Sequence, residues 1–135
     1  MRIVLDTNSL IQCIGRHSIY RDVWLSVLKG CNTLCLSNEI LFEYEEILCR
    51  FFNKDLAASV INTIMECGHV ELVNPAFHFN LITADPDDNK FVDCAIQANA
   101  RYIVTNDGHY NVLRHIDFPK VDIVRLMDFL LMMHA

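Results

Sequence analysis

The residues Arg2-Ile3-Val4-Leu5 form a short, uninterrupted apolar run that stops at Asp6. A run of this length without polar alternation is typical of a strand buried on both faces, as strands of parallel sheets are. Further short apolar runs recur along the chain, and they predict additional strands. These runs cover residues 33–36, 70–73, 102–105 and 121–124.

Helical spacing of apolar residues separates these runs, most clearly over residues 38–52. Asn8 and Ser9 are expected to cap a helical turn through residues 10–14. Further helices are expected over residues 19–28 and 53–65, in the segment that ends near Asn99, and after residue 124. Strands that alternate with helices predict a three-layer α/β/α fold with a central, mostly parallel sheet of about five strands. The length of 135 residues suits one domain, residues 1–135.

Composition narrows the class of protein. A hydrophobic content of 53% with 21% charged residues is typical of a globular chain. The net charge of -6 lacks the basic surplus common in nucleic-acid binders, although acids gathered around a metal also count as negative. With no signal peptide and no apolar run of roughly 20 residues, we expect a cytoplasmic protein without a membrane anchor. The six cysteines are then expected to be free thiols.

Acidic residues are densest in the stretch Asp85-Pro86-Asp87-Asp88-Asn89-Lys90-Phe91. The simplest interpretation is a helix start, with Asp85 as the N-cap and Pro86 as the first helical residue. Asp87 and Asp88 would then lie in the first turn, where the helix dipole favours negative charge. This interpretation needs no ligand.

Other acids are predicted to lie at the same edge of the sheet. The carboxyl ends of parallel strands and the N-termini of the following helices share one edge, where open α/β sheets bind ligands. Asp6 ends the first strand, Asp107 follows the fourth, and Glu43 lies near the start of the helix over 38–52. Asp87 and Asp88 lie at the start of the helix before the fourth strand, so we expect one acidic rim.

Carboxylates gathered within a few ångströms are costly unless they are protonated or bound to cations. Oxygen ligands favour Mg²⁺ or Mn²⁺, and such a site suits hydrolysis of a phosphodiester. Asn8, Thr105 and Asn106 adjoin these acids. They are candidates for hydrogen bonds to the acids or to the metal's waters, and equally for capping and turn formation.

Four blocks of the sequence together resemble a PIN domain, in that family's order and spacing. They are Ile3–Asn8, Ser37–Glu43, Asp85–Phe91 and Tyr102–Asp107. The acidic block is similar to that of the PIN toxins of prokaryotic toxin–antitoxin systems. The resemblance therefore implies an endoribonuclease that depends on Mg²⁺ or Mn²⁺ and acts on RNA.

The resemblance also implies site residues and partners. Its four acids fall on Asp6, Glu43, Asp88 and Asp107, with Asp6, Asp88 and Asp107 as metal ligands. Counting back from Thr105, the usual third position falls near Asn89, so Asp88, or alternatively Asp87, takes its place. A small antitoxin protein and a homodimer are the partners that the family suggests. Exposed aromatic or Met residues near 51–52 or at 127–133 are candidates for an interface, although burial in the core is the simpler expectation.

Several basic residues accompany the expected site and are candidates for phosphate binding: Lys90, Arg101, Arg114 and Lys120. His109 closely follows Asp107. His109 is a candidate general base or phosphate contact, or an ordinary surface histidine. Two other functions compete with the nuclease: a PIN-like scaffold that binds RNA or protein without cleaving, and an aspartyl-phosphate phosphatase. The phosphatase needs a second acid two residues after Asp6, where Asn8 stands.

Overall fold

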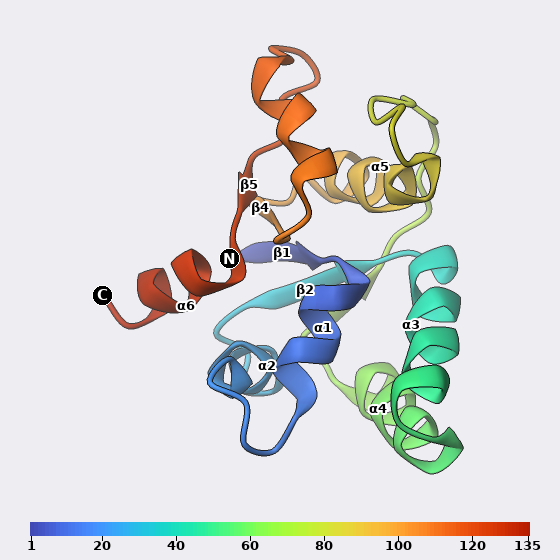
Figure 1. The fold of residues 1–135 in the computed structure, drawn as a ribbon, viewed down its shortest axis with the longest axis vertical. Coiled ribbons are helices and arrows are strands. Elements are labelled where there is room, and N and C mark those ends of the chain that lie inside the picture. The colour runs from blue at the N-terminus through green and yellow to red at the C-terminus, as the bar shows by residue number, and fades with distance from the viewer.

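The computed structural model describes residues 1–135 and contains one five-stranded sheet in which every neighbouring pair of strands is parallel (Figure 1). The order across the sheet is β3-β2-β1-β4-β5. All five expected strands are present, and the predicted parallel sheet is confirmed. The strands are β1 (Arg2–Leu5), β2 (Thr33–Leu36), β3 (Val70–Leu72), β4 (Tyr102–Val104) and β5 (Ile123–Val124).

Helices connect the strands and enclose the sheet. Figure 1 shows α5 on one face of the sheet, with α1, α2 and α4 on the other, which is the expected three-layer arrangement. None of these helices combines the length and the apolar character needed to cross a bilayer. The helices are α1 (Thr7–Ile14), α2 (Arg21–Leu28), α3 (Asn38–Phe51), α4 (Lys54–Glu66), α5 (Asn89–Ala98) and α6 (Leu126–Met133), with the 3₁₀ segments η1 (Pro86–Asp88) and η2 (Gly108–His115).

The central strand β1 lies at the heart of the core. Ile3, Val4 and Leu5 are fully buried, because α5 covers one face of the sheet and the N-terminal helices cover the other. The hydroxyl group of Tyr44, on α3, donates a hydrogen bond of 2.6 Å to the carbonyl oxygen of Leu5. This bond fixes the carboxyl end of β1, which leads directly into Asp6.

Two helix starts differ from expectation. The cap of α1 is Asp6, whose carboxylate accepts a hydrogen bond of 2.8 Å from the backbone N–H of Ser9. The prediction of Asn8 or Ser9 as the cap is therefore wrong. The acidic stretch begins as the 3₁₀ turn η1, so Asp87 and Asp88 precede α5 instead of lying in its first turn. Asp85 caps this turn as expected, since it accepts from the N–H of Asp87.

The order of strands creates a switch point between β1 and β4. The chain leaves β1 towards α1 on one face, and it leaves β4 towards η2, which lies on the same side as α5 (Figure 1). Adjacent strands whose connections diverge in this way open a crevice at their carboxyl ends, which is where open α/β sheets bind ligands. Asp6 and Asp107 are the acidic residues at these two strand ends.

Candidate metal centre

Thr105 links the two acids at the switch point. Its buried hydroxyl donates a hydrogen bond to the Asp6 carboxylate, and its Oγ1 accepts from the N–H of Asp107 at 3.0 Å. Asp107 in turn accepts a bond of 2.8 Å from the N–H of His109 and so caps η2. Each acid therefore has a fixed orientation, since one carboxylate oxygen of each accepts a backbone hydrogen bond.

Of the two alternatives for the third acid, Asp88 lies near Asp6 and Asp107, and Asp87 does not. Asp88 is half-buried and feels the charges of Asp107 and Asp6. Asp87 is exposed and lines a different pocket together with Glu39. Asn89, at the position where an acid was considered, is buried and exchanges two hydrogen bonds of 2.9 Å with the backbone of Ile82. Its amide N–H₂ donates one of these bonds, and an ionised carboxylate could not replace it.

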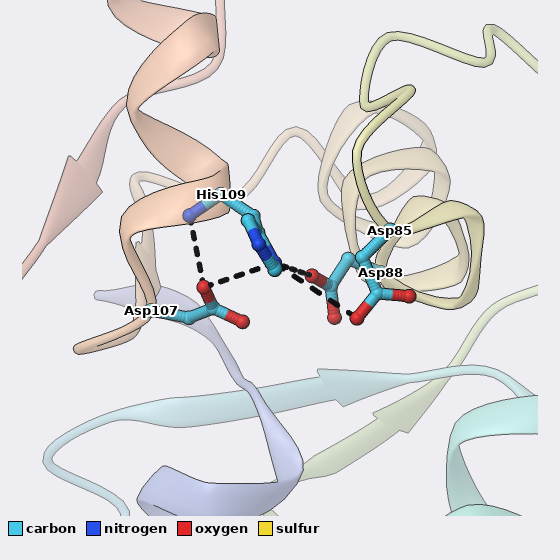
Figure 2. A group of neighbouring side chains, drawn as sticks. All are labelled: Asp85, Asp88, Asp107 and His109. Atoms are coloured by element: carbon cyan, nitrogen blue, oxygen red, sulfur yellow. Dashed lines mark hydrogen bonds and ion pairs between the residues drawn. The ribbon is translucent and has the colours of Figure 1, made fainter.

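The structure gathers two of the predicted metal ligands, Asp88 and Asp107, with two residues outside the predicted set, whereas Asp6 is not among these four. Figure 2 shows Asp85 and Asp88 at the start of α5 facing Asp107 and His109, which follow β4. One ligand atom from each of the four residues lies within 4.8 Å of the others. The sequence indicates Asp85 only as a helix cap, and His109 as a general base, a phosphate contact or an ordinary surface histidine, but not as a member of the acidic cluster. Three acids in four positions were the available signal for Asp85, but nothing in the sequence shows which way the His109 ring turns.

The electrostatics of the cluster are dominated by Asp88. Burial, followed by the negative charges of Asp85, Asp107 and Asp6, raises its pKa to about 7, and His109 only partly offsets this. One Asp88 oxygen, Oδ2, is buried without a hydrogen-bond partner. Burial also raises the pKa of Asp6, although its hydrogen bonds from Thr105 and Ser9 oppose the shift. The site thus holds more negative charge than the protein neutralises.

Glu43 lies at the margin of the cluster rather than within it. Its carboxylate accepts a hydrogen bond from the hydroxyl of Thr7, on α1, and forms an ion pair of 2.8 Å with Lys90, on α5. It is not among the four residues whose ligand atoms approach one another. The predicted fourth acid therefore joins α1, α3 and α5 beside the acidic cluster.

The supporting amides take different positions. Asn8 is exposed and lines a groove of about 350 Å³ together with Asp6 and Asp107. Asn106 borders the same groove, but its side-chain oxygen accepts a hydrogen bond of 3.0 Å from the N–H of Leu126 at the start of α6. Of the three uncharged candidates, Thr105 alone bonds directly to a site acid.

A parallel α/β sheet with carboxylates gathered at its switch point defines a class of protein with an acidic ligand site at the strand ends. The chain belongs to the PIN domain family, whose profile matches residues 2–109. None of the curated protein sequences compared with the chain matches it.

Solved structures share the fold at low sequence identity. The structure of VapBC2 from Rickettsia felis bound to a DNA fragment from its promoter matches with a TM-score of 0.64. The two sequences are 19% identical, and the match covers 93% of this chain and 98% of that chain. VapBC-1 from nontypeable Haemophilus influenzae gives 0.63 at 16% identity, covering 94% and 99%. The PIN domain endonuclease Utp24 gives 0.53 at 16% identity, covering 92% and 84%.

Proposed function

We propose that this PIN domain is a metal-dependent endoribonuclease and the toxin of a toxin–antitoxin pair. It would hydrolyse RNA phosphodiester bonds with Mg²⁺ or Mn²⁺ bound by Asp6, Asp88 and Asp107. The observation that carries the proposal is the unbalanced negative charge at the switch point, where Asp88 Oδ2 is buried without a hydrogen bond. A divalent cation would satisfy this oxygen and remove the repulsion among the carboxylates.

The residues present fit such an ion. Carboxylate oxygens are the ligands that Mg²⁺ and Mn²⁺ prefer, and the oxygens of Asp88 and Asp107 lie within 4.8 Å of each other. When bound, the metal activates a water and neutralises charge that develops on the phosphate.

The chain's own side chains orient the ligands. Thr105 and the N–H of Ser9 hold both oxygens of Asp6, and the N–H of His109 holds one oxygen of Asp107. The ion pair of Glu43 with Lys90 fixes α3 against α5 at the edge of the site. We propose that Glu43 and Lys90 position the substrate beside the other acids, and that Glu43 is the fourth functional acid.

Among the predicted basic candidates, Arg114 is the one free to bind a phosphate. Lys90 pairs with Glu43, whereas Arg101 and Lys120 both pair with Asp122. Arg114 is exposed, forms no ion pair, and borders a small cavity together with Asp107. Arg125 lines the same cavity and was not anticipated from the sequence. We infer that Arg114 contacts the RNA backbone next to the metal centre.

Replacing Arg114 with glutamine is expected to raise the KM for single-stranded RNA about fivefold, as for the loss of about 1 kcal/mol from an exposed charge contact. The salt dependence of binding should weaken by about 0.7 in log–log slope, the value for one phosphate of a single strand. Binding and cleavage measured over a salt series test this. Lys29→Gln is the matched control, because Lys29 is exposed at the end of α2, in the connection that leads to the amino end of β2 and so away from the strand ends that carry the acids. Equal effects of the two variants would contradict the assignment.

A cleavage assay tests the nuclease directly. The purified chain is incubated with single-stranded RNA and Mn²⁺, with and without excess chelator, and with DNA of the same sequence in parallel. We expect internal cleavage of the RNA that stops when the metal is chelated. Binding of RNA without cleavage would favour the inactive scaffold, and cleavage unaffected by chelator would exclude a metal mechanism.

The toxin role requires a protein partner. The VapBC structures that share the fold support a small antitoxin, and the resemblance also suggests a homodimer. Phe51 is 66% exposed on α3 and Met132 is 40% exposed on α6, so the simpler expectation of burial in the core is wrong at these positions, whereas it is confirmed for the buried Phe129. Exposed apolar side chains on two helices offer surface for such a partner.

A further inference from the structure

His109 turns its ring into the acidic cluster, although the ring is half-exposed and free to face solvent (Figure 2). Its Nδ1 lies 3.3 Å from Asp107 Oδ1, 3.8 Å from Asp88 Oδ2 and 3.9 Å from Asp85 Oδ2. Two of these carboxylates come from the segment before α5, and the third precedes η2. The imidazole nitrogen therefore sits among oxygens that two distant segments contribute.

The separations suit a single ion. A small divalent cation binds oxygen or nitrogen at about 2.1 Å, so neighbouring ligand atoms lie about 3 Å apart and opposite ones about 4.2 Å apart. The nitrogen–oxygen distances of 3.3–3.9 Å fall between these values. Small rotations of side chains would place all four atoms around one cation.

A buried hydroxyl group points to a ligand at the same place. Tyr110 is fully buried, and its hydroxyl faces the Asp88 carboxyl group without forming a regular hydrogen bond. Buried polar groups are normally satisfied, so this unsatisfied contact between Tyr110 and Asp88 indicates a site that is completed by something bound. Hydroxyls placed behind metal-binding carboxylates typically orient them.

We propose that His109 is a nitrogen ligand of the metal centre and that Asp85 adds a further oxygen, an inference that rests on the proposed function. A nitrogen ligand favours a first-row transition ion such as Mn²⁺ over Mg²⁺, which prefers oxygen alone. His109 is thus the residue that sets which metal the site takes. The acids Asp88 and Asp107 bind either ion.

The competing role for His109 is that of a counter-ion. In that case the protonated ring occupies the metal's place, and removing it improves metal binding. If His109 is a ligand, removing its side chain weakens metal binding. The two roles therefore predict opposite changes in metal affinity. The His109 side chain is half-exposed, so substitutions there are expected to fold.

The experiment measures Mn²⁺ and Mg²⁺ affinities of the purified, metal-free chain by calorimetry. Wild type is compared with His109→Ala, with His109→Gln as a second variant, and with His78→Ala as the control, because His78 also neighbours an acid, Asp93. We expect both His109 variants to lose Mn²⁺ affinity at least tenfold, the lower end of losses seen when even an outer partner of a metal site is removed. Mg²⁺ affinity should change less, and His78→Ala should match wild type.

Unchanged or tighter Mn²⁺ binding by the His109 variants would overturn the inference, as would an equal loss for both metals. Pulsed electron paramagnetic resonance adds a direct readout, since Mn²⁺ coordinated by imidazole shows coupling to nitrogen. That coupling should be present in wild type and absent in His109→Ala, and its absence from wild type refutes the proposal. A protein that shows the nitrogen coupling but cleaves no RNA supports His109 as a ligand and refutes the proposed nuclease function. A protein that cleaves RNA without nitrogen coupling supports the nuclease function and refutes His109 as a ligand.

Discussion

Replacing Asp6 with asparagine is expected to reduce RNA cleavage by about 100- to 1,000-fold or more, the scale of removing one preorganised electrostatic group. The substitution removes a negative charge from the carboxyl end of β1. It keeps an oxygen that accepts from the N–H of Ser9, so the cap of α1 survives, because asparagine caps helices as well as aspartate does. Initial cleavage rates with saturating Mn²⁺ measure the effect.

Folding of the Asp6→Asn variant needs its own check. Because the pKa of Asp6 is raised by burial, the uncharged side chain is easier to bury, and the melting temperature in chelator should not fall. Asp117→Asn, which removes the same charge from an exposed loop, should cleave at the wild-type rate. Undiminished cleavage by folded Asp6→Asn would refute the metal site at the switch point.

The second large effect concerns stability. Mn²⁺ at about 100 times its Kd should stabilise wild type by about 2.7 kcal/mol, which corresponds to a rise in Tm of about 8–10 °C for a domain of this size. Asp88→Asn removes the carboxylate with the orphaned oxygen and should largely abolish this rise. Asp87→Asn is the matched control, since Asp87 is the neighbouring, exposed acid and should keep the full shift.

Without metal, the same carboxylate makes stability depend on pH. The pKa of Asp88 rises from an ordinary 3.8 to about 7 in the folded protein, mainly through burial and then through the nearby acids. Between about pH 4 and 7 the folded state therefore binds more protons than the unfolded state, and stability falls as pH rises through this window. Thermal melts in chelator should show this decline in wild type and a weaker one in Asp88→Asn. At neutral pH the metal-free variant should be the more stable protein.

The outcome that contradicts this account is specific. A wild-type protein whose metal-free Tm rises between pH 4 and 7 by the same amount as that of Asp88→Asn would show that Asp88 is not held in a negative cluster. Retention of the full Mn²⁺ shift by Asp88→Asn would show that the ion binds elsewhere.

Much of this organisation is visible in local sequence. Short apolar runs such as residues 2–5 are hydrophobic without alternation because both faces of a central parallel strand are buried. This pattern can be recognised from the sequence of the strand alone. Asp6 and Asp107 follow such runs, so topology alone places them at the rim of the sheet. Asp85 was correctly predicted as a cap from its position before a proline.

Other features depend on atoms that meet only after folding. The choice of Asp88 over Asp87 follows from the turn η1, which points successive side chains in different directions. Glu43 was expected among the acids, but Thr7 and Lys90 hold it at the margin. No periodicity or spacing encodes such a contact, because it depends on how α1, α3 and α5 pack against one another.

By itself, the sequence determined the α/β/α fold, its parallel sheet and the edge at which the acids lie, because these follow from hydrophobic patterning and from the order of strands and helices. Only the tertiary structure decided which carboxylates share one small volume, that His109 turns towards them, and that Asp88 Oδ2 is buried without a hydrogen bond. Those facts are distances between segments far apart along the chain, and they arise from packing, which no local pattern of residues records.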